Sequence, residues 1–119
     1  MAGLAIQGDE LVVTLSAFER LVALHGDVRV PLAAVSEVRL ESDPWCALRG
    51  VRAPGTGFPG VIAYGVRRGT GGRPDFAAVL GRGAAVRVEL TAAAPYARLL
   101  VTVTDPGATV AAVARGVGG

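Results

Sequence analysis

The sequence predicts one domain of mainly β structure, an antiparallel barrel or sandwich of about seven strands with a C-terminal helix. Apolar and polar residues alternate over short segments along most of the chain, as in strands that bury one face. Helical spacing is clear only near residues 17–25 and after Asp105. The strands therefore follow one another as a meander and not as strand–helix–strand units. No polar linker divides the 119 residues, so we expect a single domain over 1–119.

Three strands are predicted in the first half of the chain. A turn at Gln7–Asp9 leads into a half-buried strand over Glu10–Leu15. A second strand covers Val28–Val30 and ends at Pro31. The third, Glu37–Glu41, is the clearest, because it alternates strictly between charged and apolar side chains.

A short helix is predicted after the first long strand. Ser16 and Glu19 have the spacing of a capping box, in which each side chain accepts a hydrogen bond from the backbone amide of the other. We therefore expect a helix over Ala17–His25. Its apolar face is predicted from i, i+3, i+4 spacing to consist of Phe18, Leu21 and Val22.

The second half of the chain alternates between loops and strands. The predicted strands are Val61–Val66, Phe76–Leu80, Ala85–Leu90 and Leu99–Thr104. A short glycine turn joins the second and third of these, which predicts a hairpin. Pro54–Gly60 is predicted to be a loop. Asp105 and Pro106 supply a cap and a first-turn proline, so a terminal helix follows them.

The composition indicates the cellular compartment in which we expect the protein. The longest uncharged run, Ala53–Val66, has 14 residues and contains four glycines and two prolines. A membrane-spanning helix needs about 20 apolar residues, so we expect none here. No basic region precedes an apolar N-terminal segment, and we expect no signal peptide. The single cysteine, Cys46, cannot form an internal disulfide, which favours the cytoplasm.

The segment Trp45–Asp75 is the candidate contact surface. It holds 8 of the 17 glycines and 5 of the 12 arginines of the chain, and Asp75 is its only acidic residue. Guanidinium groups bind phosphate and carboxylate in bidentate fashion, and glycine-rich turns can present adjacent amides to an anion. The candidate cationic contacts are Arg49, Arg52, Arg67, Arg68 and Arg73, and the candidate apolar anchors are Trp45 and Phe58.

Two other interpretations of this segment remain open. The arginines are also typical of solvated loops in a chain that contains no lysine and is rich in alanine, glycine and valine. Gly55–Gly60 matches the spacing G-x-G-x-x-G, but the residues that follow it predict a strand and not the helix that a dinucleotide site requires. We therefore interpret these glycines as a turn.

The sequence contains no set of residues that indicates a metal site or a cofactor. His25 is the only histidine, and one histidine with one cysteine gives no zinc-ligand spacing. Its position in the last turn of the predicted helix favours an interaction with the helix carbonyls. Cys46 or Ser42 would serve as a nucleophile only if folding brought a base beside it, which leaves a small enzyme as an alternative.

The order of the elements and the segment VRVPLAAVSEVRL resemble small bacterial proteins of the pleckstrin-homology-like class. The resemblance implies a barrel closed by the C-terminal helix and a scaffold for binding. Phosphoinositide-binding members place basic residues between the first two strands. Here that connection contains the capped helix, with only Arg20 and His25 as cations, so phosphoinositide recognition is not carried over.

We therefore expect a non-enzymatic interaction module that binds a protein partner or a second copy of itself. Self-association is suggested by Val12 and Leu100, which the alternation places on the outward faces of their strands. Peripheral binding to an anionic membrane or to a phosphate-bearing ligand through the arginine loops is the alternative. Nucleic-acid binding is not expected, because the basic excess is small and few aromatic residues are available for stacking.

Overall fold

The computed structural model describes residues 2–23, 26–48, 51–58, 62–68 and 72–118, and of residues 51–58 and 118 it describes only the backbone. The strands are β1 (Gly3–Gln7), β2 (Glu10–Thr14), β3 (Val28–Pro31), β4 (Val35–Glu41), β5 (Val51–Phe58), β6 (Ile62–Arg68), β7 (Asp75–Leu80), β8 (Ala85–Leu90) and β9 (Arg98–Val101). The helices are α1 (Ala17–Ala23), the 3₁₀ turn η1 (Leu32–Ala34), α2 (Pro44–Ala47) and α3 (Pro106–Gly118). A mainly β fold with a C-terminal helix is confirmed.

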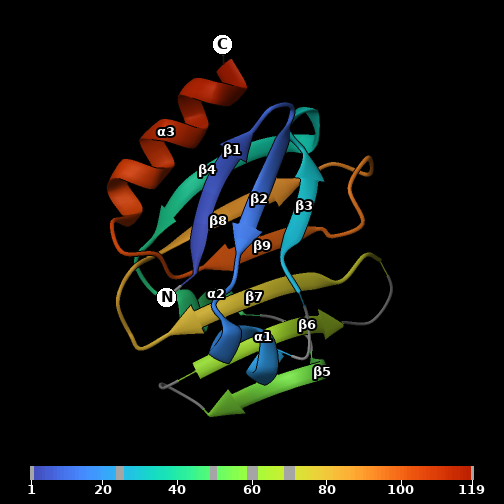
Figure 1. Cartoon of the computed structure of the whole chain (residues 1–119), viewed down its shortest axis with the longest axis vertical. Helices are drawn as coiled ribbons and strands as arrows, with labels where there is room; N and C mark the ends of the chain where they lie inside the picture. Colours follow the sequence, from blue (N-terminus) through green and yellow to red (C-terminus); the bar gives the residue numbers. More distant parts are fainter. Residues whose placement is uncertain (1, 24–25, 49–50, 59–61, 69–71, 119) are drawn as a thin grey trace.

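The strands form two sheets that lie one in front of the other (Figure 1). The smaller sheet has the order β1-β2-β3, and the larger has the order β4-β8-β9-β7-β6-β5. Helix α3 runs alongside β1 at one end of the molecule, and α1 lies over β5 and β6 at the other (Figure 1). The larger sheet has two open edges, β4 and β5, so the sheets do not close. Of the two predicted alternatives, a barrel or a sandwich, the barrel is therefore wrong.

The connection between β4 and β5 crosses the larger sheet. These consecutive strands lie at opposite edges, and the chain between them crosses the outer face of the sheet as α2. Asp43 caps this short helix by accepting a hydrogen bond from the Cys46 amide at 3.3 Å, and Pro44 occupies its first turn. No element was predicted from the sequence at α2. The predicted loop over Pro54–Gly60 is wrong as far as Phe58, because the described residues there continue strand β5.

The predicted hairpin of β7 and β8 is also wrong. Strand β9 lies between them, antiparallel to β8 and parallel to β7. Leu99, Leu100 and Val101 are at most 2% exposed, so both faces of β9 are buried. A strand that is apolar on both faces is stabilised in the interior of a sheet, and β9 takes that position in place of direct β7–β8 pairing.

The main core lies between the two sheets. Leu11 and Val13 of β2 pack in one cluster with residues of the larger sheet such as Phe76 and Leu99, and Val113 of α3 joins the same cluster. A second, smaller cluster covers the outer face of the larger sheet. It consists of Ala63, Ala77, Val79, Ala85 and Leu100, with Trp45, Ala47 and Leu48 of the α2 segment packed against them.

Helix α1 begins as predicted but turns a different face inward. The capping box is confirmed: the Ser16 amide donates to Glu19 Oε1 at 2.9 Å, and the Glu19 amide donates to Ser16 Oγ at 3.2 Å. The predicted apolar face is wrong in two of its three residues, because Phe18 is 61% and Leu21 70% exposed. Glu19 and Ala23 are buried instead. The Glu19 carboxylate can be buried because the Tyr64 hydroxyl of β6 donates a hydrogen bond to it.

Candidate functional site

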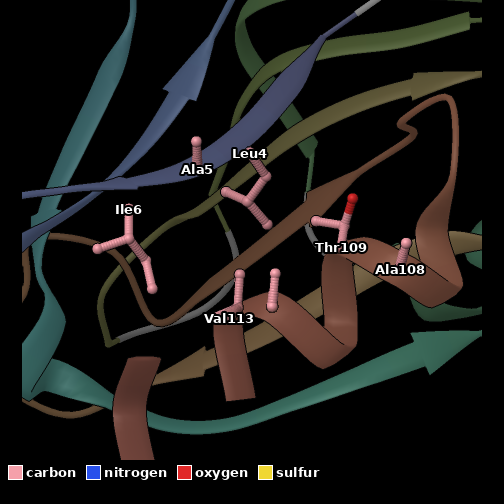
Figure 2. Close-up of a pocket in the computed structure, with 7 residues that line it drawn as sticks. Leu4, Ala5, Ile6, Ala108, Thr109 and Val113 are labelled. Carbon is pink, nitrogen blue, oxygen red and sulfur yellow. The ribbon is translucent and has the colours of Figure 1, made fainter. Parts of the chain in front are cut away.

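An apolar groove of about 390 Å³ separates strand β1 from helix α3. Figure 2 shows Leu4 and Ile6 of β1 pointing toward α3, whereas Ala5 points away from the helix. The groove is lined by Leu4, Ala5 and Ile6 of β1 and by Ala108, Thr109, Ala112 and Val113 of α3. All seven lining residues are uncharged, and four are alanine or threonine. The volume falls within the range of small-ligand sites, which are concave and mostly apolar.

The N-terminus of α3 is fixed on one side of the groove by a cap. Asp105 Oδ1 accepts a 3.1 Å hydrogen bond from the Ala108 amide, as predicted for a residue before a first-turn proline. The Thr109 hydroxyl donates to the Asp105 carbonyl at 2.9 Å. Thr109 therefore uses its hydroxyl proton within the helix, and it contributes its methyl group to the apolar lining.

The opposite wall of the groove is the edge strand of the smaller sheet. Among the described strands, β2 is the single neighbour of β1, so β1 is paired along one side. A two-residue turn joins the two strands, with Gly8 at a φ of 64° as primed hairpin turns require. Leu4 is buried and Ile6 is half-buried, so β1 contributes both to the core and to the wall of the groove.

A close contact between Ile6 and Gly116 limits the groove at one end. A Cβ atom at position 116 would overlap the Ile6 side chain, so glycine allows α3 to approach β1 here. Gly116 also lines a second hollow of about 390 Å³. The other residues of that hollow are Asp9, Pro31, Leu32, Ala33, Val35 and Val117. The Ile6–Gly116 contact therefore lies where the two hollows meet.

Of the predicted cationic contacts, Arg73 is engaged inside the protein. Its guanidinium group donates to the backbone carbonyls of Leu90 (3.1 Å), Thr91 (2.7 Å), Ala94 (3.2 Å) and Tyr96 (2.5 Å). Arg73 thus holds the segment between β8 and β9 in place. Four carbonyl partners leave its guanidinium little capacity for an external anion.

Two other predicted arginines belong to a row of charged residues that crosses the larger sheet in register. The row contains Arg52, Arg67, Asp75, Arg98, Glu89 and Glu37, one from each strand. Arg67 is thus placed directly opposite Asp75. Arg98 Nε donates to both carboxylate oxygens of Glu89, at 2.9 and 2.8 Å. Acidic residues at neighbouring positions therefore offset much of the positive charge that the sequence concentrates here.

The remaining predicted site residues lie only partly within the described part of the chain. Arg68 is exposed at the end of β6, next to the half-buried Arg67. Arg49 and His25 lie outside the described residues, as do the side chains of Arg52 and Phe58. Burial raises the pKa of Tyr96, and the positive charge of Arg68 acts against this shift, so Arg68 lies near the residue whose carbonyl accepts a hydrogen bond from Arg73.

Trp45 stabilises the fold from the outer face of the larger sheet. Its indole Nε1 donates to the Gly81 carbonyl at 2.7 Å, and its ring packs on the cluster that contains Ala77 and Leu100. Leu100 is 2% exposed and Val12 is 1% exposed. The chain itself therefore covers both residues that the sequence analysis offered as grounds for self-association.

Cys46 is exposed, but its surroundings do not activate it. The thiol donates to Asp43 Oδ2 at 3.0 Å, and this hydrogen bond, followed by the negative charge of Asp43, raises the pKa of Cys46. The same hydrogen bond lowers the pKa of Asp43. Because the thiolate is the nucleophile, a raised thiol pKa disfavours covalent catalysis at neutral pH.

The buried hydrogen bond between Tyr64 and Glu19 was not predicted from the sequence. The Tyr64 hydroxyl, in a residue only 2% exposed, donates to Glu19 Oε2 at 2.8 Å. Burial raises the pKa of Glu19, but hydrogen bonds from the Ser16 amide, Tyr64 and the Ser16 hydroxyl outweigh it and lower the pKa overall. Burial, and then the hydrogen bond to Glu19, raise the pKa of Tyr64. The capping box alone gave no sign of this contact.

The groove residues also carried no recognisable signal in the sequence. Leu4 and Ile6 look like ordinary core residues, and Ala108 and Ala112 like ordinary helix formers.

Of the helices that the structure describes, none has the length and hydropathy of a membrane span. No group of three or more histidine, cysteine, aspartate or glutamate residues in the described part of the chain is arranged to hold a metal. Comparison with protein-family models, characterised proteins and solved structures finds no match.

Proposed function

We propose that this chain is a non-enzymatic binding module that holds an uncharged, apolar ligand segment in the groove between β1 and α3. The observation that carries the proposal is the lining of that groove, which consists of seven uncharged residues. A charged group placed there would lose its hydration without gaining a partner from the lining. An apolar group would gain by leaving water, at about 25 cal/mol per Å² of buried apolar surface.

The neutral dye N-phenyl-1-naphthylamine tests this proposal directly. We expect its fluorescence to rise on binding and the binding to weaken at least tenfold in Ala112→Phe. Ala112 is exposed and lines the groove, so the added ring fills the groove without entering the core. Ala111→Phe is the matched control, because Ala111 is exposed on the same helix but does not line the groove. Equal binding by both variants and the parent chain would exclude the groove as the site.

Two observations support a binding role over an enzymatic one. The hydrogen bond from the Cys46 thiol to Asp43 raises the pKa of the thiol, which disfavours a nucleophilic role. The groove itself contains no acid, base or thiol in its lining. We retain the cytoplasm as the proposed compartment, because the single cysteine cannot form an internal disulfide.

The relation to pleckstrin-homology-like proteins also remains a proposal. It is supported by the order of the elements, in which successive strands are followed by one C-terminal helix. The open edges of the larger sheet and the parallel pairing of β7 with β9 differ from the closed antiparallel barrel that the resemblance implies. The proposed binding function does not depend on this relation.

The arginine-rich segment is the weaker candidate surface. It is supported by the exposure of Arg68 at the end of β6. Arg73 is engaged internally, and Arg67 lies opposite Asp75. If this surface binds anionic vesicles, Arg68→Met weakens co-sedimentation at low salt, and the effect disappears as salt rises. Co-sedimentation that salt does not reduce would contradict this electrostatic mechanism.

A further inference from the structure

Helix α1 covers part of the larger sheet at the end of the molecule away from α3. It lies over β5 and β6 (Figure 1). Along the chain it is inserted between β2 and β3, which pair with each other in the smaller sheet. We infer that α1 is a hinged lid on the larger sheet, which opens as a unit while both sheets stay folded. This inference does not depend on the groove between β1 and α3.

The sequence of α1 gives the helix little apolar surface to bury. A surface helix is usually held by a stripe of apolar side chains that faces the core. Of the three large apolar side chains of α1, Phe18 is 61% and Leu21 70% exposed, and only Val22 packs against the core. Ala23 is fully buried but contributes a single methyl group. Opening therefore exposes little apolar surface that is not already in water.

A buried polar contact attaches α1 to the larger sheet instead. The Tyr64 hydroxyl of β6 donates to Glu19 at 2.8 Å, and each of the two residues is only 2% exposed. When α1 opens, water hydrates both the carboxylate and the hydroxyl. Because water replaces the lost partner, the net contribution of such a bond is much smaller than its strength in isolation. An element with little apolar burial and a replaceable polar contact opens at a lower free energy than the core.

The chain on the two sides of α1 is joined by a contact that does not involve the helix. The Leu15 amide donates to Asp27 Oδ1 at 2.9 Å, next to the pairing of Val13 with Val28. Arg20 of α1 also donates to the Leu15 carbonyl and to Asp27, but its side chain is half exposed, and exposed ion pairs contribute little to stability. The base of the lid can therefore stay in place when α1 leaves the sheet.

Native-state hydrogen exchange, followed by NMR at low urea concentrations, tests this inference. The reporters of the core are the amides of Val88 and Leu99, fully buried residues of strands that are paired on both sides. After correction for intrinsic rates, we expect the amides of Leu21, Val22 and Ala23 to exchange at least tenfold faster than these reporters. The three α1 amides should share one opening constant that hardly changes with urea, because local opening exposes little surface.

Three results of this measurement would overturn the inference. A difference of less than tenfold between α1 and the core reporters, or the same urea dependence for both, would show that α1 opens only when the whole protein unfolds. Rates that rise steadily toward one end of α1 would indicate fraying of the helix and not a lid that moves as a unit.

Two variants separate the opening of α1 from the stability of the whole protein. Tyr64→Phe removes a contact that exists only while α1 is closed, so it should speed exchange in α1 at least fivefold. Arg73→Met is the matched control, because the described hydrogen bonds of Arg73 hold the segment between β8 and β9. It should speed exchange at Val88 and Leu99 and leave the α1 amides unchanged. If the α1 rates follow those of Val88 and Leu99 in both variants, α1 is part of the core and the lid is excluded.

Discussion

The hydroxyl of Tyr64 donates a 2.8 Å hydrogen bond to Oε2 of Glu19, and this bond connects strand β6 to helix α1 in the interior. Glu19 also accepts a hydrogen bond from the Ser16 amide at its other carboxylate oxygen. One carboxylate therefore caps the helix and attaches it to the larger sheet. A buried carboxylate is tolerated only when its oxygens are hydrogen-bonded, so this pair explains why α1 turns Glu19 inward and leaves Phe18 outside.

Replacing Tyr64 with phenylalanine should lower the free energy of unfolding by about 2 kcal/mol, because a buried carboxylate loses a charge-assisted hydrogen bond. Urea unfolding followed by circular dichroism measures the change. The control is a double-mutant cycle with Glu19→Gln. Additive effects of the two substitutions would show that the Tyr64–Glu19 bond contributes nothing beyond the separate environments of the residues.

The stability of the fold should depend on pH through the same pair. The pKa of Glu19 is lower in the folded state than its ordinary value of 4.5. Its contribution is therefore present above about pH 4.5 and is lost as pH falls through the lower folded value. The pKa of Tyr64 is raised above its ordinary value of 10, so its contribution is present below pH 10 and is lost at more alkaline pH.

Unfolding free energies measured from pH 3 to pH 11 test both directions. Glu19→Gln should flatten the acid limb of the profile, and Tyr64→Phe should flatten the alkaline limb. An acid limb that stays as steep in Glu19→Gln as in the parent chain would assign the acid sensitivity to other carboxylates.

Replacing Arg73 with methionine should destabilise the protein by about 2 kcal/mol, because four backbone carbonyls lose their shared donor. Arg68→Met is the matched control, since Arg68 is exposed, and its effect should stay within about 0.5 kcal/mol. Thermal unfolding of the two variants distinguishes a structural role of Arg73 from a role as an anion contact. If Arg73→Met is as stable as the control, Arg73 is free to act as an anion contact after all.

The thiol of Cys46 should react slowly with a disulfide reagent at pH 7, because Asp43 raises its pKa. Asp43→Asn removes the negative charge and retains a side chain that can cap α2, so the reaction should become several-fold faster. The rate at which the Cys46 thiol reduces Ellman's reagent measures this reactivity. A parent rate that already exceeds that of free cysteine would instead indicate an activated thiol and revive the enzymatic alternative.

Local features of the fold were predictable because their causes lie within a few residues. The capping box of Ser16 and Glu19, the turn at Gly8 and the cap of α3 at Asp105 all depend on contacts across three residues or fewer. The strands at Glu10 and Glu37 follow from alternation alone. These features confirmed the α+β class but not the arrangement of the strands.

The apolar groove and the role of Arg73 were not predictable, because each depends on segments far apart in the chain. The groove joins β1 to a helix about one hundred residues later. Arg73 reaches carbonyls in the segment between β8 and β9, and an arginine in a glycine-rich loop gives no local sign of that contact.

By itself, the sequence determined most of the strands and the two capped helices α1 and α3, since side-chain alternation, caps and turn residues act locally, but it did not indicate α2 or β5. The tertiary structure alone decided that β9 lies between β7 and β8, that β4 and β5 occupy opposite edges, and that Glu19 faces inward. The reason is physical: an apolar strand is stabilised by many neighbours to a similar extent, and only the packing of the whole chain selects among them.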